Sequence, residues 1–208
     1  MENIAFYGGS FNPPTNIHLQ RAKNVLKQLN IDKVYFVPVG NYYQKNELID
    51  VKHRLNMLNI MCENQDKMYV SDITLNEKNN LKAIDVFKML KEKYSNDNAY
   101  FIMGSDNFIK ITEWKNFEEL VENYKIIIVK RDNVDINKII LENRILEINK
   151  NNFFIINSED TQNKVDSTEV RRKIKNSENI DKYLNKKISE YIVQNGLYLD
   201  NEDDIIEE

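Results

Sequence analysis

The stretch that decides the fold is residues 4–18, which run Ile4-Ala5-Phe6-Tyr7-Gly8-Gly9-Ser10-Phe11-Asn12-Pro13-Pro14-Thr15-Asn16-Ile17-His18. Its first four residues form an apolar run that stops at a glycine pair, which predicts a buried strand ending in a tight turn. Apolar residues then recur with helical spacing over 17–29. The chain has five glycines and three prolines, and two of each fall in this turn. The stretch therefore predicts a strand, a tight turn and a helix.

The same alternation continues along the chain. Further apolar runs predict strands at 34–37, 68–70, 99–103, 125–129 and 153–156. Between and after them, helical spacing predicts helices over 51–61, 81–94, 168–175 and 180–193, and Gly196 is expected to stop the last one. Strands that alternate with helices indicate βαβ units. We therefore expect an α/β fold with a Rossmann-like, doubly wound parallel sheet and helices on both faces.

Composition limits the class of protein. With 208 residues, the chain suits one domain, expected over 1–199, followed by an acidic tail over 200–208 that frays. A net charge of −4 argues against a general nucleic-acid binder. The sequence has neither an apolar run of membrane-spanning length nor a signal peptide at its start. The single cysteine, Cys62, excludes an internal disulfide and a cysteine-based zinc site, and it favours a cytoplasmic location.

The glycine turn lies where a ligand would bind. In open α/β sheets, ligands bind beyond the carboxyl ends of the strands, and a helix N-terminus favours an anion. The backbone of Gly8, Gly9, Ser10 and Phe11 is therefore expected to approach a phosphate closely. The stretch contains neither the dinucleotide-binding glycine pattern nor a Walker A loop.

The same turn resembles the first signature of the HxGH-type nucleotidyltransferase superfamily. The matching residues are Gly9, Phe11, Asn12, Pro13, Thr15 and His18. Ile17 stands where the superfamily has glycine. Either Ile17 lies in ordinary helix, which tolerates it, or the pocket differs there. Without the superfamily, the segment would be a glycine-proline turn with an exposed histidine.

Residues 165–171 resemble the second signature of that superfamily. Ser167, Thr168 and Arg171 match it, while Asp166 replaces the first serine. Serine and threonine suit a helix N-cap, and the free N–H groups of a helix start bind phosphate oxygens. Arg171 is expected on the same side of that first turn, where it would add a bidentate contact. The alternative is a simple capped helix with a surface arginine.

The middle of the chain is similar to bacterial nicotinate-nucleotide adenylyltransferases. The similarity lies in residues 36–40, 53–58, 103–106 with Trp114, and 129–131. It implies that Gly104 and Asp106 border the ATP site, with Asp106 bound to a ribose hydroxyl, and that Trp114 stacks near the nicotinate ring. The alternatives are that Asp106 caps a helix and that Trp114 belongs to the core.

The resemblance implies that Lys45, Lys82, Trp114 and Arg131 bind the mononucleotide. Two segments depart from the family there, Lys82-Ala83 and Tyr42-Tyr43-Gln44-Lys45. Both lysines would neutralise the substrate phosphate, or both would be solvated surface residues.

The implied reaction joins ATP and nicotinate mononucleotide into the dinucleotide and releases pyrophosphate. His18 and Thr15 would act on the α-phosphate, and Arg171 with Ser167 and Thr168 would hold pyrophosphate. Mg²⁺ would arrive with ATP, held by substrate and water, so no metal-ligating side chains are predicted. The partners are then small molecules, ATP and a pyridine mononucleotide. The sequence does not indicate an oligomeric state.

Two other functions stay open from the sequence. One is a nucleotidyltransferase that uses CTP or a different phosphorylated acceptor, such as phosphopantetheine. The other is a regulatory protein that binds ATP and has lost the transfer reaction.

Overall fold

The computed structural model describes residues 1–43, 47–130, 134–158 and 166–199. A six-stranded sheet lies at its centre, in the order β3-β2-β1-β4-β5-β6, and every neighbouring pair is parallel. The strands are β1 (Asn3–Gly9), β2 (Lys33–Pro38), β3 (Met68–Val70), β4 (Asn98–Gly104), β5 (Lys125–Lys130) and β6 (Phe153–Asn157). The chain moves outward from β1 to β3 and then returns to β4, so the order reverses between β1 and β4. The predicted doubly wound sheet is confirmed.

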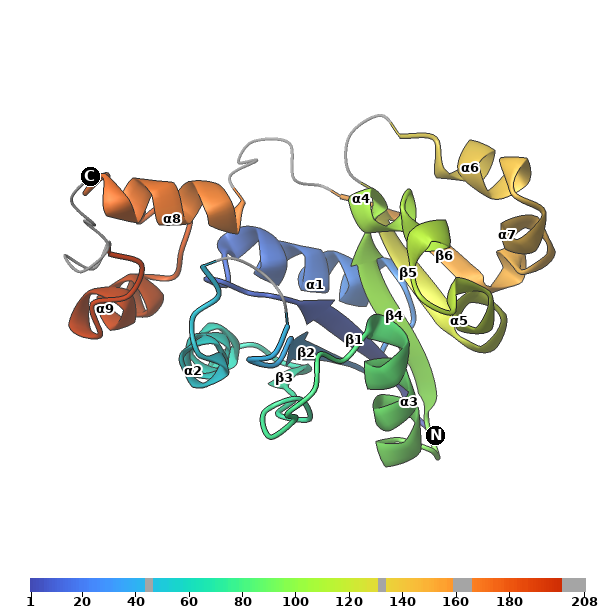
Figure 1. Ribbon diagram of the computed structural model, residues 1–208, viewed down its shortest axis with the longest axis horizontal. Helices are drawn as coiled ribbons and strands as arrows, with labels where there is room; N and C mark the ends of the chain where they lie inside the picture. Colours follow the sequence, from blue (N-terminus) through green and yellow to red (C-terminus); the bar gives the residue numbers. More distant parts are fainter. Residues whose placement is uncertain (44–46, 131–133, 159–165, 200–208) are drawn as a thin grey trace, which may run out of the picture.

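Helices cover both faces of the sheet (Figure 1). One apolar cluster joins the sheet to α1 (Asn16–Gln28), α2 (Val51–Cys62), α8 (Ser167–Lys175) and α9 (Lys186–Gln194). The other cluster joins it to α3 (Ala83–Lys93), α5 (Phe117–Asn123), α6 (Ile136–Glu142) and α7 (Arg144–Ile148). The remaining elements are α4 (Ser105–Phe108) and the 3₁₀ turns η1 (Ile111–Glu113) and η2 (Lys150–Asn152).

Strand β1 shows why both faces need cover. Ala5 and Tyr7 pack in the first cluster, whereas Ile4 and Phe6 pack in the second. Successive side chains of a strand point to opposite faces, so a central parallel strand needs apolar residues at every position. That need explains the unbroken apolar run before Gly8.

The last helix differs from its prediction. Helix α9 begins at Lys186, not at residue 180, because the side chain of Asn185 accepts the N–H of Lys187 (2.9 Å) and caps the helix there. The segment before it is used elsewhere: the Tyr183 carbonyl accepts the N–H of Asn16 at the start of α1 (2.9 Å). Gly196 follows the C-cap of α9 with a φ of +58°, so its predicted role as the stop is confirmed.

The helices between β4 and β6 were not predicted. Each of α4 to α7 has only four to seven residues. Two turns or fewer show too little of the 3.6-residue repeat for a pattern to be read. The predicted fraying tail, 200–208, lies outside the described residues.

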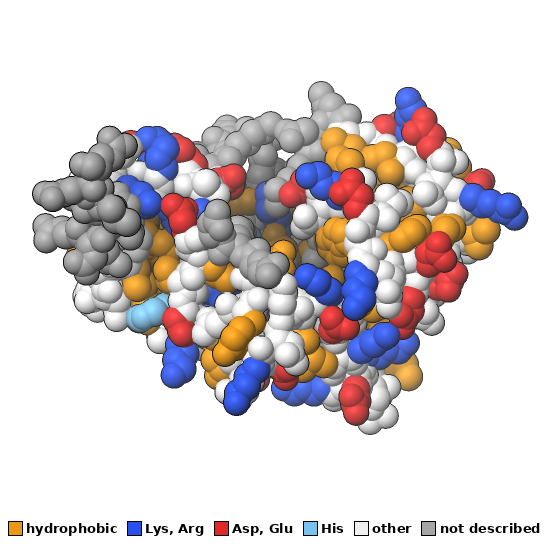
Figure 2. All heavy atoms as spheres, in the orientation of Figure 1, with side chains coloured by type: hydrophobic (Ala, Val, Ile, Leu, Met, Phe, Trp, Pro, Cys, Tyr) orange, Lys and Arg blue, Asp and Glu red, His pale blue; other side chains and the backbone are white. Residues whose placement is uncertain are grey.

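The face seen in Figure 2 mixes lysine and arginine with aspartate and glutamate. No helix in the described part of the chain is long and apolar enough to cross a membrane.

Candidate functional site

A cavity of about 1450 Å³ opens beyond the carboxyl ends of β1 and β4, where the strand order reverses. Pockets for drug-sized ligands usually measure about 300–1,000 Å³, so this one has room for two joined nucleotides. Its lining includes these predicted site residues: Gly8, Gly9, Ser10, Phe11, Thr15, His18, Lys82, Gly104, Asp106, Trp114, Ser167 and Thr168.

Two buried side chains, Phe11 and Arg54, hold the glycine turn in place. Phe11 has a φ of +45° and is 1% exposed, and its ring lies against those of Tyr7, Phe36 and His18. Arg54 of α2 is fully buried, and its guanidinium donates to the carbonyls of Ser10 (2.9 Å) and Ile49 (3.0 Å). Burial lowers the pKa of Arg54 to about 10, so its guanidinium remains charged at neutral pH.

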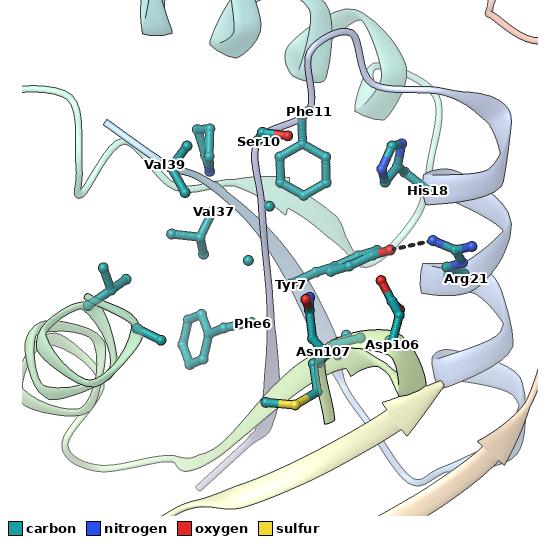
Figure 3. Close-up of a pocket in the computed structure, with 18 of the residues that line it drawn as sticks. Phe6, Tyr7, Ser10, Phe11, His18, Arg21, Val37, Val39, Asp106 and Asn107 are labelled. Atoms are coloured by element: carbon teal, nitrogen blue, oxygen red, sulfur yellow. Dashed lines mark hydrogen bonds between the residues drawn. The ribbon is translucent and has the colours of Figure 1, made fainter. Parts of the chain in front are cut away.

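His18 is fixed by the residue that precedes α1. The backbone N–H of Thr15 donates to Nδ1 of His18 (2.9 Å), and the Thr15 hydroxyl lies 2.9 Å from the same nitrogen. Since Nδ1 accepts this bond, the proton of the neutral ring is on Nε2. A ring held in this way has its donor nitrogen on the side away from Thr15. Figure 3 shows His18 beside Phe11, at the edge of the cavity.

Ile17 is in the first turn of α1 and lines the cavity. Its φ is not among the positive values of the described residues. The first of the two expectations for Ile17, ordinary helix, is therefore the one that the structure adopts.

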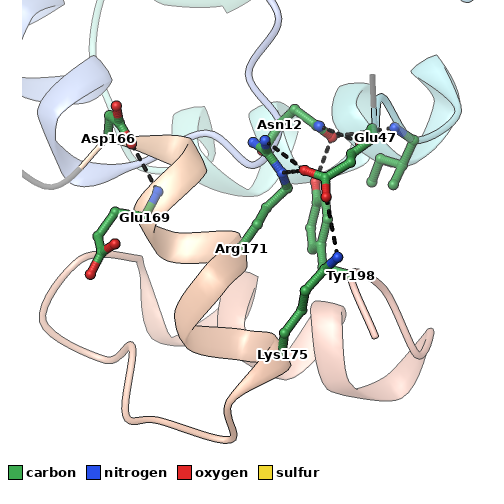
Figure 4. A network of polar contacts seen from close by, with 8 residues as sticks. Asn12, Glu47, Asp166, Glu169, Arg171, Lys175 and Tyr198 are labelled. Carbon is green, nitrogen blue, oxygen red and sulfur yellow. Dashed lines mark hydrogen bonds and ion pairs between the residues drawn. The ribbon is translucent and has the colours of Figure 1, made fainter. Parts of the chain in front are cut away.

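Arg171 is placed differently from its neighbours in the second signature. It is 5% exposed and is not among the residues that line the cavity. Its guanidinium donates to the carbonyl of Asn12 (2.9 Å) and, through Nε and Nη2, to Glu47 (3.2 and 3.1 Å). Lys175 donates to the same carboxylate (3.1 Å), and Figure 4 shows this network. Lys175 and then Arg171 lower the pKa of Glu47 below its ordinary value.

The start of α8 is capped by the residue that departs from the signature. The Asp166 side chain accepts the N–H of Glu169 (2.8 Å), so Asp166, rather than Ser167 or Thr168, is the N-cap. The Ser167 hydroxyl donates to the Pro13 carbonyl (2.8 Å), which joins the two signatures directly. Thr168 is exposed on the first turn and borders the cavity.

Of the remaining predicted residues, four line the cavity: Gly104, Asp106, Trp114 and Lys82. Gly104 ends β4 and is the N-cap of α4, so the alternative in which Asp106 is the N-cap is wrong. Trp114 is half-buried, contacts the second apolar cluster and also lines the cavity, and Lys82 is exposed just before α3. Lys45 and Arg131 lie outside the described residues.

Two functional candidates escaped the sequence prediction: Arg21, which lines the cavity, and Arg54, which holds the turn. Arg21 follows His18 by three residues on α1, so helical spacing could have placed both on one face. The burial of Arg54 could not be predicted from the sequence, because an arginine on a helix is usually solvated. Among the described residues, no group of three or more His, Cys, Asp or Glu side chains could hold a metal ion.

Comparison with known proteins decides the family. The family model described as cytidylyltransferase-like matches residues 6–173. A probable nicotinate-nucleotide adenylyltransferase of Acholeplasma laidlawii is 33% identical over 94% of this chain and 97% of its own length. The chain belongs to the nicotinate-nucleotide adenylyltransferase family.

Other members of the nicotinate-nucleotide adenylyltransferase family agree with this assignment. A probable enzyme of Fusobacterium nucleatum is 34% identical over 91% of this chain and 96% of its own length. The structure of the Plasmodium falciparum nicotinic acid mononucleotide adenylyltransferase complexed with NaAD has a TM-score of 0.78 and 26% identity, over 95% of this chain and 98% of that chain. The expected resemblance is therefore confirmed, and the chain is a nucleotidyltransferase.

Proposed function

We propose that this chain transfers the adenylyl group of ATP to nicotinate mononucleotide, giving nicotinate adenine dinucleotide and pyrophosphate. The observation that carries the proposal is the fixed ring of His18 at the junction of β1 and α1, beside a cavity with room for two nucleotides. The family to which the chain belongs supports the choice of substrates.

The attacking group is the phosphate of the mononucleotide. Its second pKa is near 6, so it is largely dianionic at pH 7 and needs no general base. Catalysis is then a matter of position and charge, as in other phosphoryl-transfer reactions. Nε2–H of His18 donates to the α-phosphate as negative charge grows there, and Thr15 keeps the ring in that orientation.

The two nucleotides occupy different parts of the cavity. The adenosine half lies toward Gly104, Asp106 and the start of α8, where Asp106 accepts a ribose hydroxyl. The pyridine half lies toward Trp114 and Lys82, because this part of the wall includes an aromatic ring and a cation. Mg²⁺ would be supplied together with ATP and would offset part of the phosphate charge. The single cysteine favours a reducing, cytoplasmic location for the reaction.

Arg171 as a ligand of pyrophosphate stays a prediction. Its guanidinium is bound to Glu47 and Asn12, so contact with pyrophosphate requires the ion pair with Glu47 to open. Ser167 and Thr168 border the cavity directly, so these two residues of the second signature are better placed than Arg171 to contact the leaving pyrophosphate.

The experiment measures pyrophosphate release from Mg-ATP with nicotinate mononucleotide, nicotinamide mononucleotide, phosphopantetheine or no acceptor. We expect release with nicotinate mononucleotide and its loss in His18→Ala. The chain has two histidines, so His53→Gln is a matched control: His53 lies on α2 with Nδ1 2.9 Å from the Tyr191 hydroxyl. Release with phosphopantetheine alone, or ATP binding with no release, would contradict the proposal.

A further inference from the structure

Arg21 brings a positive charge to the cavity wall in an unusual setting. It is 9% exposed, whereas Lys82 and Lys115, which also line the cavity, are exposed. A lysine in water is strongly screened by solvent, but a buried guanidinium acts through a medium of lower dielectric constant. Among these three cations, Arg21 therefore exerts the strongest electrostatic field on a ligand bound in the cavity.

Arg21 has few hydrogen bonds to offset the cost of burying its charge. Nη1 lies 3.5 Å from the hydroxyl of Tyr7, the upper limit for a hydrogen bond. Nε is buried and has no hydrogen-bond partner. Among the described residues, no carboxylate forms an ion pair with Arg21. Buried charges are normally paired, so a partner is missing.

Arg171 shows what a satisfied buried arginine looks like in this protein. It is buried to a similar degree, and its guanidinium is bonded to the Glu47 carboxylate and the Asn12 carbonyl. Arg54 has two backbone carbonyls as acceptors, although its Nη2 is buried without a hydrogen-bond partner among the described residues. Within the described ranges neither a carboxylate nor a carbonyl accepts from Arg21, although it is the one of the three arginines that borders the cavity.

The position of Arg21 indicates its ligand. It follows His18 by one helical turn, so both side chains leave the same face of α1. Side chains of a helix tilt toward its N-terminus, which directs the guanidinium back toward His18. Tyr7 lies against both residues, with its ring centroid 6.2 Å from that of His18. Figure 3 shows the Tyr7 hydroxyl pointing to Arg21, with a dashed line for the hydrogen bond between them.

We propose that Arg21 is a phosphate-binding residue, which takes the α-phosphate of the adenylyl group together with His18. Nη2 is not among the buried nitrogens that lack a partner, so it is the nitrogen of Arg21 that can donate to a phosphate oxygen in the cavity. The inference rests on the proposed function, because the ligand is the phosphate that His18 contacts in that reaction. In this arrangement Arg21 neutralises part of the phosphate charge, a task that the resemblance to the second signature assigned to Arg171.

The test compares AMP with adenosine by titration calorimetry, because the two probes differ only in this phosphate. The wild-type chain should bind AMP more tightly than adenosine. Arg21→Met should weaken AMP binding about ten- to a hundredfold, the loss of a hydrogen bond to a charged group, and leave adenosine binding unchanged. Arg21→Lys should recover part of the preference for AMP, and kcat/KM for ATP should fall in parallel.

Tyr7→Phe is the matched control, since it removes the hydroxyl that accepts from Arg21 and leaves the charge of Arg21 in place. This variant should keep the preference for AMP. An equal loss of AMP and adenosine binding in Arg21→Met and Arg21→Lys would assign Arg21 to structure and overturn the inference, as would an unchanged preference for AMP. A wild-type chain that prefers AMP yet releases no pyrophosphate with nicotinate mononucleotide would instead refute only the proposed function.

Discussion

Gly9 is where one methyl group should disturb the site most. A Cβ at this position would lie 3.0 Å from Cζ of Phe11 and 3.2 Å from both Cε atoms. Such contacts are tighter than nine in ten real Cβ contacts, so in Gly9→Ala the ring or the strand must shift by a few tenths of an ångström. The ring has little space to move, because it is 1% exposed and packs against three other rings.

The size of the effect follows from that confinement. Overpacking a filled core by one carbon costs about 1–3 kcal/mol. For a chain of this length, each kcal/mol lowers Tm by about 2–4 °C, so Gly9→Ala should melt about 2–12 °C lower than the wild type. His18 is the ring neighbour on the cavity side, with its centroid 5.1 Å from that of Phe11. Displacement of Phe11 should therefore lower kcat as well as stability.

Calorimetry and steady-state kinetics check this prediction, and Gly8→Ala is its control. Nothing lies within 4 Å of a Cβ on Gly8, which borders the cavity. Gly8→Ala should therefore keep the wild-type Tm and raise the KM for ATP, because its methyl group enters the space of the substrate. If Gly9→Ala melts at the wild-type temperature with unchanged kcat, the reasoning about the confined ring is wrong.

Three further predictions concern side chains of the site. His18→Ala should lower kcat about 10²–10³-fold, the usual loss for one preorganised donor to a transition-state oxygen, as measured by pyrophosphate release. The depressed pKa of Glu47, caused by Lys175 and Arg171, stabilises the fold above pH 4.5, and urea titrations should show that stability lost as the pH falls through the lower folded-state pKa. Since Glu47 is half exposed, the effect is small, and Glu47→Gln should remove it. Arg54→Met leaves two buried carbonyls without donors and should lower the free energy of unfolding by about 2–4 kcal/mol in urea; equal stability would show that water replaces the guanidinium.

The sheet could be predicted because its strands are buried on both faces. Each run, such as 125–129, needs apolar residues at every position, and glycine or proline marks where several runs end. The turn at Gly8 and Gly9 could be predicted because it follows the end of a buried strand. The helix that carries His18 could be predicted because its start follows that turn.

The partners of charged side chains could not be predicted. Glu47 and Arg171 are 124 residues apart, and no local pattern joins them. The spacing of the second signature places Arg171 on one side of a helical turn, but tertiary contacts decide whether that side faces the cavity or Asn12. The burial of Arg21 and Arg54 also depends on neighbours from other elements, which a periodic pattern does not contain.

The hydroxyl of Tyr198 donates to the Asn12 side chain (3.0 Å), across 186 positions of sequence. Tyr198 is buried, and burial raises its pKa, so the phenol is neutral when it makes this bond. During synthesis Asn12 leaves the ribosome 186 residues before Tyr198. A nascent chain thus carries both signature motifs before it can close the contact that secures the first one. Until Tyr198 is made, the turn has its contacts with Arg54 and Ser167 but lacks this last hydrogen bond.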